Sequence, residues 1–276
     1  MTAHPKVTLV TCSSMPHLFP GEEGLLDELA SRGCDPQIKV WNDPDVDWSE
    51  AGMVVVRSVS DYASDRPAFL EWTKQLRRVQ NSADVLNWNT DKHYLKELAA
   101  LGMPTIPTNW LEPEQNLSKH QIHTRFPAFG EFVVKPAVSS GVRDIGRYTT
   151  VDTRQRQAAM RQVQGLLGEG RSVMIQRYVE EIDLHGEISL VFFNGLVSHA
   201  VEKRSALHPA SVSDPAVHEA VVTAEAADSV AWKWGEEIRR VLHGYVRSRL
   251  GHDEQFLFNR VDLVPDGKGS FLVMEV

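Results

Sequence analysis

Cysteine and long hydrophobic runs are scarce in this chain of 276 residues. Its two cysteines, Cys12 and Cys34, are too few for a zinc ribbon or a disulfide framework, which favours a reducing, cytoplasmic setting. No run of about 18 apolar residues occurs, so no segment is expected to cross a membrane. The N-terminus enters a strand-like segment without an apolar leader, so we do not expect a secretory signal.

Positive charge is also in short supply, because 29 Lys and Arg residues face 37 Asp and Glu residues, a formal net charge of −8. This balance argues against nonspecific binding of DNA or RNA, which relies on a basic face. It leaves room for a local cationic site that binds a small anion. Hydrophobic residues make up 42% of the chain, so a predominantly disordered state is excluded.

Several common catalytic motifs are missing. The sequence contains no G-x-S-x-G and no H-E-x-x-H, which argues against an α/β-hydrolase and a zincin. Gly267-Lys268-Gly269 lacks the upstream glycine of a P-loop, and the glycines of Gly165–Gly170 follow a predicted helix instead of a strand. His120 and His123, three residues apart in a polar segment, suit a solvated pair better than a zinc site.

The first 88 residues alternate between strand-like and helix-like segments. Strands are expected at Lys6–Cys12, Pro36–Trp41, Met53–Arg57 and Val85–Asn87, and helices at Gly24–Ser31 and Pro67–Val79. The valines of the third strand suit burial on both faces. Alternation of this kind predicts an open α/β sheet.

The pattern after residue 88 changes from this alternation to hairpins and longer helices. Asn194-Gly195 is a strong turn signal and predicts a hairpin. Its strands are Ile188–Phe193 and Leu196–Lys203, and a second hairpin joins Phe256–Val264 to Phe271–Val276 through a turn. Further strands are expected at Phe132–Pro136 and Ser172–Tyr178, helices at Asn89–Leu101, Val151–Leu167 and Val217–Leu250, and loops at Ala137–Gly146 and Leu207–Asp214.

The C-terminal hairpin brings charged residues together. Arg260 and Asp262 are two apart on one strand and share a face, and the turn places Asp262 opposite Glu275. Two carboxylates facing each other across strands repel, and their apolar sequence neighbours make burial costly without a cation. Either Mg²⁺, which prefers oxygen ligands, joins the two carboxylates, or one carboxylate lies at the surface and the other forms an ion pair with Arg260.

Three other segments carry charge at the ends of apolar strands. Lys135 ends one strand and is followed by small residues whose backbone N–H groups can face an anion. Four acids follow the apolar run that begins at Met174, and Lys203 and Arg204 end another strand. Each segment alone is more often a solvated charge run or a snorkelling lysine than a site.

Taken in order, these segments resemble the ATP-grasp superfamily over residues 89–276. The matching motifs are Asn89–Lys92, Met103–Thr108, Val134–Pro136, Gln176–Val179, Gly186-Glu187, Lys203-Arg204, Arg260–Asp262 and Met274-Glu275. The resemblance implies an α/β fold in which an N-terminal open α/β domain, 1–88, precedes two ATP-grasp subdomains, 89–177 and 178–276, that hold ATP between them. The family pattern places a third metal ligand two residues after Glu275, so we expect either that a C-terminal tail is missing or that the second metal site is incomplete.

The resemblance also implies roles for single residues. Lys92, Lys135 and Lys203 are expected at the phosphates of ATP, and Arg260 at the transferring phosphoryl group. Asp262 and Glu275 are expected to hold Mg²⁺, with Mn²⁺ as an alternative. The remaining expected contacts to ATP are the covering loop Ser139, Ser140 and Gly141, then Gln176, the adenine-side Tyr178 and Val179, and Asp183 or Glu187 at the ribose.

On the substrate side, the resemblance assigns Arg57 to the carboxylate substrate. Arg57–Tyr62 looks like the substrate-side turn of the family's small α/β domain. A tryptophan usually stands where this chain has Ser60, so we expect an altered substrate pocket.

The early segments and the Val138–Tyr148 loop are similar to those of the cycloserine-forming cyclo-ligases. This implies an ATP-dependent carboxylate–amine ligase that passes through an acyl phosphate and closes O-ureido-D-serine to D-cycloserine. Alternatives are another amino-acid or peptide ligase, a kinase, or a nucleotide-binding regulator on the same fold. The expected partner is a small-molecule carboxylate, with no nucleic acid or membrane, in a monomer or homodimer.

Overall fold

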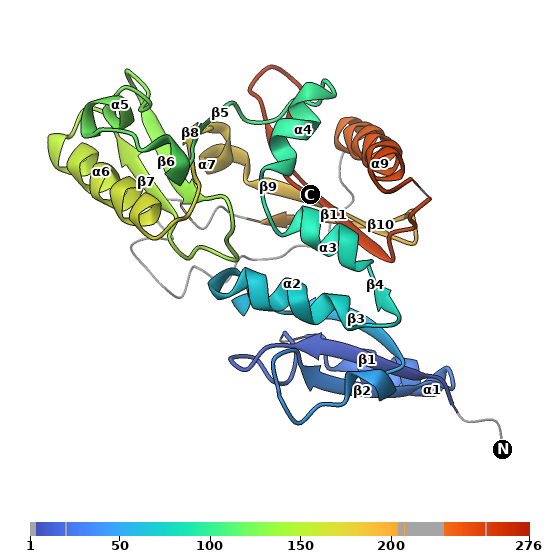
Figure 1. Ribbon diagram of the computed structural model, residues 1–276. Helices are drawn as coiled ribbons and strands as arrows, with labels where there is room; N and C mark the ends of the chain where they lie inside the picture. The colour runs from blue at the N-terminus through green and yellow to red at the C-terminus, as the bar shows by residue number, and fades with distance from the viewer. Residues whose placement is uncertain (1–3, 20, 204–206, 208–228, 252) are drawn as a thin grey trace. The chain divides into compact units, whose positions relative to one another are not determined.

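The computed structural model describes residues 4–19, 21–203, 207, 229–251 and 253–276 (Figure 1). It divides into two compact units, Met1–Thr90 with Glu254–Leu257, and Asp91–Asp253 with Phe258–Val276. Among the helices of the described residues, none is both long and apolar enough to cross a membrane.

The N-terminal unit is a parallel four-stranded sheet with helices, as expected for an open α/β domain (Figure 1). The strand order is β2-β1-β3-β4. The strands are β1 (Lys6–Thr11), β2 (Asp35–Val40), β3 (Met53–Ser58) and β4 (Val79–Gln80). The helices are α1 (Gly24–Ser31), α2 (Arg66–Lys74) and α3 (Ala83–Asn89), with short 3-10 turns at Trp48–Glu50 and Asp61–Ser64.

The two faces of this sheet carry separate cores. Val54 and Val56 of β3 pack with Trp41, Phe69 and other residues on one face. Val55 packs with Val7, Leu9 and Leu18 on the other face. The expectation that this valine run contacts a core on both faces is confirmed.

The prediction of a strand at Val85–Asn87 is wrong, because these residues lie in α3 and the fourth strand is the two-residue β4. The Ser82 hydroxyl accepts a hydrogen bond from the Val85 backbone N–H, at 3.3 Å, and so caps the helix. Two apolar residues followed by an asparagine cannot distinguish a strand from a helix, and the cap decides for the helix.

The helix expected over Asn89–Leu101 is interrupted. α3 ends at Asn89 and α4 covers Tyr94–Ala100. The Asp91 carboxylate accepts from the His93 backbone N–H at 3.1 Å, which stabilises a turn in place of a helix. The boundary between the two units, at Thr90 and Asp91, falls in this turn.

The second unit contains two antiparallel sheets. The first has the order β5-β8-β6-β7 and is covered by α6 (Thr153–Gly168). Its strands are β5 (Thr108–Leu111), β6 (Glu131–Pro136), β7 (Gly146–Thr149) and β8 (Val173–Arg177), with a 3-10 turn at Pro113–Gln115 and α5 at Lys119–His123. Phe132, Val134 and Ile175 of the sheet pack against Ala159 and Val163 of the helix.

The second sheet has the order β10-β9-β11-β12, and α9 (Ser229–Leu250) packs against β9 and β11. Its strands are β9 (Glu187–Phe193), β10 (Leu196–Lys203), β11 (Phe258–Pro265) and β12 (Phe271–Glu275), and α7 (Glu181–His185) precedes them. A Cβ at Gly235 would lie 2.3 Å from a Leu190 side-chain atom, so this glycine lets the helix approach the sheet closely.

Both predicted hairpins are confirmed. Asn194 and Gly195 have positive φ angles of 52° and 76°, as a tight hairpin turn requires. Asp262 pairs directly with Glu275 across β11 and β12. Most of the expected loop at Leu207–Asp214, the first part of the helix expected from Val217, and Arg204 lie outside the described residues. The division at residue 177 stays a prediction.

Candidate active site

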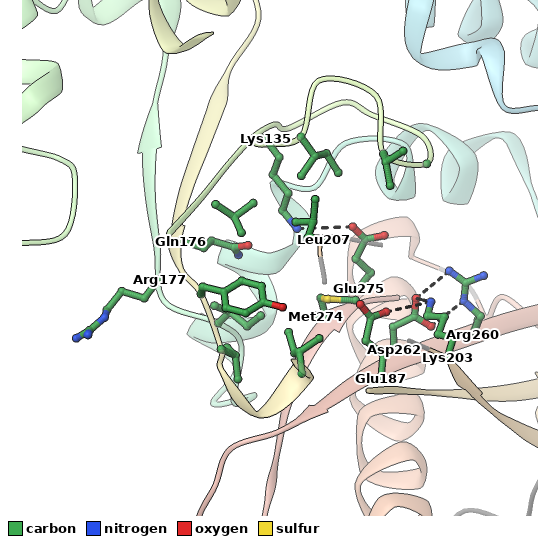
Figure 2. Close-up of a pocket in the computed structure, with 18 residues that line it drawn as sticks. Lys135, Gln176, Arg177, Glu187, Lys203, Leu207, Arg260, Asp262, Met274 and Glu275 are labelled. Carbon is green, nitrogen blue, oxygen red and sulfur yellow. Dashed lines mark hydrogen bonds and ion pairs between the residues drawn. The ribbon is translucent and has the colours of Figure 1, made fainter. Parts of the chain in front are cut away.

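A cavity of about 290 Å³ opens in the second unit, lined by residues from both antiparallel sheets (Figure 2). One end is ionic and the other apolar. The ionic end is lined by Lys135, Glu187, Lys203, Arg260, Asp262 and Glu275. The apolar end is lined by Ile106, Val133, Val142, Ile145, Tyr178, Val179, Ile182, Leu207 and Met274.

Asp262 of β11 is the most deeply buried charge at the ionic end, with 1% of its surface exposed. Arg260 donates to it from Nε at 2.7 Å and from Nη2 at 2.8 Å, and Lys203 Nζ lies 3.2 Å away (Figure 2). Burial raises the pKa of Asp262, but Arg260 and Lys203 outweigh burial and hold the pKa below its ordinary value. Of the two alternatives for this carboxylate, the ion pair with Arg260 is present.

Two buried lysines from elsewhere in the second unit lie close to Glu275 of β12. Its Oε1 lies 3.6 Å from Lys92 Nζ and 3.8 Å from Lys135 Nζ. Burial raises the pKa of Glu275, and the two lysines outweigh burial and lower it. The pKa of Lys135 is lowered as well, because burial disfavours its charge more than Glu275 favours it. The repulsion expected between Asp262 and Glu275 is therefore offset by cations.

Glu187 of β9 is the third carboxylate of the ionic end. Its Oε2 lies 3.4 Å from Lys203 Nζ. Burial raises the pKa of Glu187 in spite of Lys203, and the negative charge of Asp262 raises it further. Four cationic side chains, counting Lys92, thus face three carboxylates. With one more cationic side chain than carboxylates, the ionic end suits a negatively charged, phosphorylated ligand.

The donors at the ionic end fit a hard cation by type. Asp262 and Glu275 face each other with oxygen donors only, as Mg²⁺ or Mn²⁺ prefers, and Mg²⁺ is often held by one or two carboxylates plus phosphates. Within the described parts of the chain, no group of three or more His, Cys, Asp or Glu residues is arranged to hold a metal. These two carboxylates would therefore share a metal ion with ligand or water oxygens.

The loop after β6 is held by Lys92. The Lys92 ammonium donates to the Ser139 carbonyl at 3.1 Å and to its hydroxyl at 3.0 Å. The Lys92 backbone N–H donates to the Ala137 carbonyl at 3.0 Å. Gly141 lines the cavity with a positive φ of 63°, and Ser140 connects it to Ser139. The structure thus brings Lys92, Lys135 and the predicted loop together beside Glu275.

The apolar end combines a hydrophobic wall with a few fixed polar groups. Tyr178, Ile182 and Val179 pack with Met274 and other cavity residues. Gln176 lies at the edge of this wall and is buried, and its amide donates to the Thr108 hydroxyl at 2.8 Å. A flat apolar ligand with a polar edge fits this end.

Asp183, predicted at the ribose, is not among the residues that line the cavity. It binds Arg147 of β7, which the sequence analysis did not single out. Arg147 lies within the Val138–Tyr148 segment of the family resemblance, but nothing in the spacing of that segment marked this single residue.

A second group missed by the sequence analysis surrounds His93, next to Lys92. The His93 ring contacts Asp91 at 2.6 Å and Glu112 at 3.1 Å, and stacks on Trp110 with centroids 4.6 Å apart. The bond to Asp91 raises the pKa of His93 in spite of burial. Burial raises the pKa of Glu112, but hydrogen bonds, including one from His93, hold it at about 2. This group fixes the turn that carries Lys92, and only its place beside the motif lysine hinted at it.

Arg57 belongs to the N-terminal unit, at the end of β3, where it forms an ion pair with Glu22. Ser58 donates to the other oxygen of Glu22 at 3.0 Å. The role of Arg57 toward a substrate stays a prediction.

The chain is similar over most of its length to one curated protein. It is 33% identical over 260 residues to the cycloserine biosynthesis protein DcsG of Streptomyces lavendulae, a match covering 91% of this chain and 83% of that protein. The chain belongs to the DcsG family of ATP-grasp ligases. Residues 7–87 of this ATP-grasp ligase also match the family described as D-cycloserine synthetase DcsG, N-terminal domain.

Solved structures agree with the fold of this ligase. The crystal structure of D-cycloserine synthetase DcsG has a TM-score of 0.81 and 30% identity, covering 98% of this chain and 90% of that one. A D-alanine–D-alanine ligase from Bacillus anthracis complexed with ATP has a TM-score of 0.59 and 14% identity, covering 98% and 85%. The ATP-grasp ligase PsnB complexed with minimal precursor, Mg and ADP has a TM-score of 0.54 and 14% identity, covering 98% and 88%.

Proposed function

We propose that this ATP-grasp ligase closes O-ureido-D-serine to D-cycloserine, with ATP as the phosphoryl donor. The observation that carries the proposal is the ionic end of the cavity, where four cations surround three carboxylates beside an apolar wall. The similarity to DcsG along most of the chain supports the choice of substrate.

The cations bring together two reactants that repel each other. ATP and the substrate carboxylate are both anionic, so positive groups are needed before they meet. Lys92 and Lys135 would bind the α- and β-phosphates, and Lys203 would bind phosphate from β10. Lys135 has a lowered pKa because of burial, and an arriving phosphate would favour its charged form.

Arg260 would act on the transferring phosphoryl group. Its guanidinium is fixed by two bonds to Asp262 and half of the side chain is exposed, so N–H groups remain free to face phosphate. Mg²⁺ held by Asp262 and Glu275 would neutralise charge on the β- and γ-phosphates. Gln176, Tyr178 and Val179 would contact the adenine.

The reaction proceeds in three steps. A substrate carboxylate oxygen forms a bond to the γ-phosphorus and ADP leaves. The ureido nitrogen that is bonded to oxygen then attacks the acyl carbon, phosphate leaves, and the nitrogen loses a proton. Water finally removes the carbamoyl group from that nitrogen as CO2 and NH3, which leaves the ring N–H of D-cycloserine. Nucleophile and acyl phosphate belong to one molecule, so holding the substrate folded accelerates the second step. The Ser139–Gly141 loop, held by Lys92, would cover the acyl phosphate and keep water away.

The ribose contact is the remaining role. Asp183 and Glu187 are the two candidates, and they differ in their surroundings. Glu187 lines the cavity, whereas Asp183 is bound by Arg147 outside it.

The test is release of ADP and phosphate by the full chain with Mg-ATP and O-ureido-D-serine, followed by detection of the ring product. We expect ADP, phosphate and D-cycloserine in equal amounts, and little release with the L-enantiomer. Release only when a separate amine is added would identify another amino-acid ligase. A phosphorylated product without ring closure would identify a kinase, and no release with any carboxylate would favour a regulator.

A further inference from the structure

Arg147 joins three segments behind the apolar end of the cavity. Its Nη1 donates to Asp183 Oδ1 at 3.0 Å and its Nη2 to Asp183 Oδ2 at 2.8 Å. It also binds Glu131 of β6 and donates to the Leu207 carbonyl at 3.1 Å. One side chain on β7 is thus tied to β6, to α7 and to Leu207.

Tyr178 completes this group. Its hydroxyl donates to Asp183 Oδ1 at 2.5 Å, and the Arg147 guanidinium lies 3.6 Å from the centre of its ring. A guanidinium over an aromatic face is attracted by the ring. The ring of Tyr178 is therefore held at its face by Arg147 and at its hydroxyl by Asp183. The same ring lines the cavity.

The burial of this group makes its contacts durable. Only 13% of the Arg147 side chain and 21% of the Asp183 side chain are exposed. Both Asp183 oxygens accept hydrogen bonds from Arg147, and one of them also accepts from Tyr178. A bidentate arginine–carboxylate pair with little solvent is costly to separate, since each charge would lose its partner.

We propose that Arg147 and Asp183 are positioning residues that fix Tyr178 as the wall against which the adenine of ATP binds, and that Asp183 is not the ribose ligand. The inference rests on the proposed function, because it takes ATP as the ligand. It differs from the expectation drawn from the family resemblance, which places Asp183 or Glu187 at the ribose.

The two roles of Asp183 predict different nucleotide selectivity. A ribose ligand discriminates ATP from 2′-deoxy-ATP and 3′-deoxy-ATP, and its loss removes the discrimination. A positioning residue acts on the adenine wall, so its loss weakens the binding of ATP and of both deoxynucleotides equally. The measurement is kcat and KM of the full chain for each nucleotide, with calorimetric affinities alongside, for wild type, Asp183→Asn and Arg147→Lys.

We expect KM for ATP to rise about tenfold in both variants, as the loss of one charge-assisted hydrogen bond implies, with kcat changed by less than about threefold. The ratios of KM between ATP and each deoxynucleotide should stay within about twofold of wild type. Asp183→Asn raising KM for ATP while leaving that for one deoxynucleotide unchanged would make Asp183 a ribose ligand and overturn the inference.

Tyr178→Phe and Arg171→Lys serve as companion variants. Tyr178→Phe keeps the ring and removes only the hydroxyl, so it should fold and show part of the same uniform rise in KM. Arg171 pairs with Asp144 at 2.8 Å and does not line the cavity, so Arg171→Lys should match wild type. Wild-type KM values in Tyr178→Phe, Asp183→Asn and Arg147→Lys together would also overturn the inference.

The wild-type protein separates this inference from the proposed function. Failure of wild type to bind ATP in calorimetry would refute the proposed function and the inference with it. ATP binding and turnover by wild type, with nucleotide selectivity lost in Asp183→Asn, would refute only the inference.

Discussion

Oppositely charged groups lie closer together behind the apolar end of the cavity than around Glu275 at its ionic end. Behind the apolar end, outside the cavity lining, Arg147 binds both oxygens of Asp183 at 3.0 Å or less. At the ionic end, Lys92 and Lys135 lie 3.6 and 3.8 Å from Glu275, which is too far for a good hydrogen bond. The lysines therefore attract Glu275 without being committed to it.

The difference teaches which charges can change partners. An ion pair with two short hydrogen bonds stays in place, because a new ligand must break these hydrogen bonds before it can bind either charge. Lys135, whose ion pair with Glu275 is 3.8 Å long, can turn to a phosphate at little cost, whereas Lys92 is also held by two hydrogen bonds to Ser139. Arg260 and Asp262 combine both properties, since the pair is tight but half of the arginine side chain is exposed.

The largest effect is expected for Asp262→Asn. We expect turnover with Mg-ATP to fall about a thousandfold, since metal and arginine supply most of the stabilisation in phosphoryl transfer. Unfolding free energy should fall by about 1–3 kcal/mol, because Arg260 and Lys203 lose a charged partner. ADP release and denaturant unfolding measure both effects.

Asp266→Asn is the matched control on the same hairpin, because Asp266 lies in the turn and accepts backbone N–H bonds of Lys268 and Ser270. Its turnover should equal that of wild type. An Asp262→Asn protein that loses stability but keeps near wild-type turnover would restrict Asp262 to a structural ion pair.

Lys135→Met should lower the affinity for ATP about 10- to 100-fold in calorimetry, because one buried charge contact to phosphate is lost. Stability should change by less than about 1 kcal/mol, because burial already disfavours the Lys135 charge and methionine fills the same space. Unchanged ATP affinity would show that Lys135 does not bind ATP and is only a snorkelling lysine at the end of β6.

Arg57→Ala tests a residue that belongs to neither end of the cavity. We expect KM for the carboxylate substrate to rise about tenfold, with ATP affinity unchanged, since ligands of parallel sheets bind beyond the carboxyl ends of strands. Lys39→Ala, on the neighbouring strand β2, is the control. A substrate KM equal to that of wild type would remove Arg57 from substrate binding.

The smallest effect is expected for His93, which holds the turn that carries Lys92. Its pKa is raised, so its contribution to stability is full below about pH 6.5 and is lost as the pH rises through the raised value. His93→Gln should remove up to about 1 kcal/mol at pH 6 and less at pH 9. Thermal unfolding against pH measures this, with His120→Gln as control, and an equal loss at both pH values would contradict it.

Some features of this protein follow from short stretches of sequence. The turn Asn194-Gly195 needs positive φ angles that these two residues adopt easily, so the hairpin and its strands could be predicted. The second turn, between Pro265 and Phe271, explains its hairpin, but continuing its register would place Asp262 opposite Met274. A register shift between Asp262 and Leu263 brings Asp262 opposite Glu275 instead. Side chains along β11 alternate between its two faces, so Arg260 and Asp262, two residues apart, lie on the same face.

Other features depend on segments that meet only in the folded chain. Val85–Asn87 is a different case, because the Ser82 cap that decides for the helix lies only three residues before Val85 in the sequence. Lys92 and Lys135 reach Glu275 from distant parts of the chain, so their distances and pKa directions come from packing. Arg147 meets Asp183 because β7 and α7 come together in the second unit, and no local pattern of residue types encodes such a meeting.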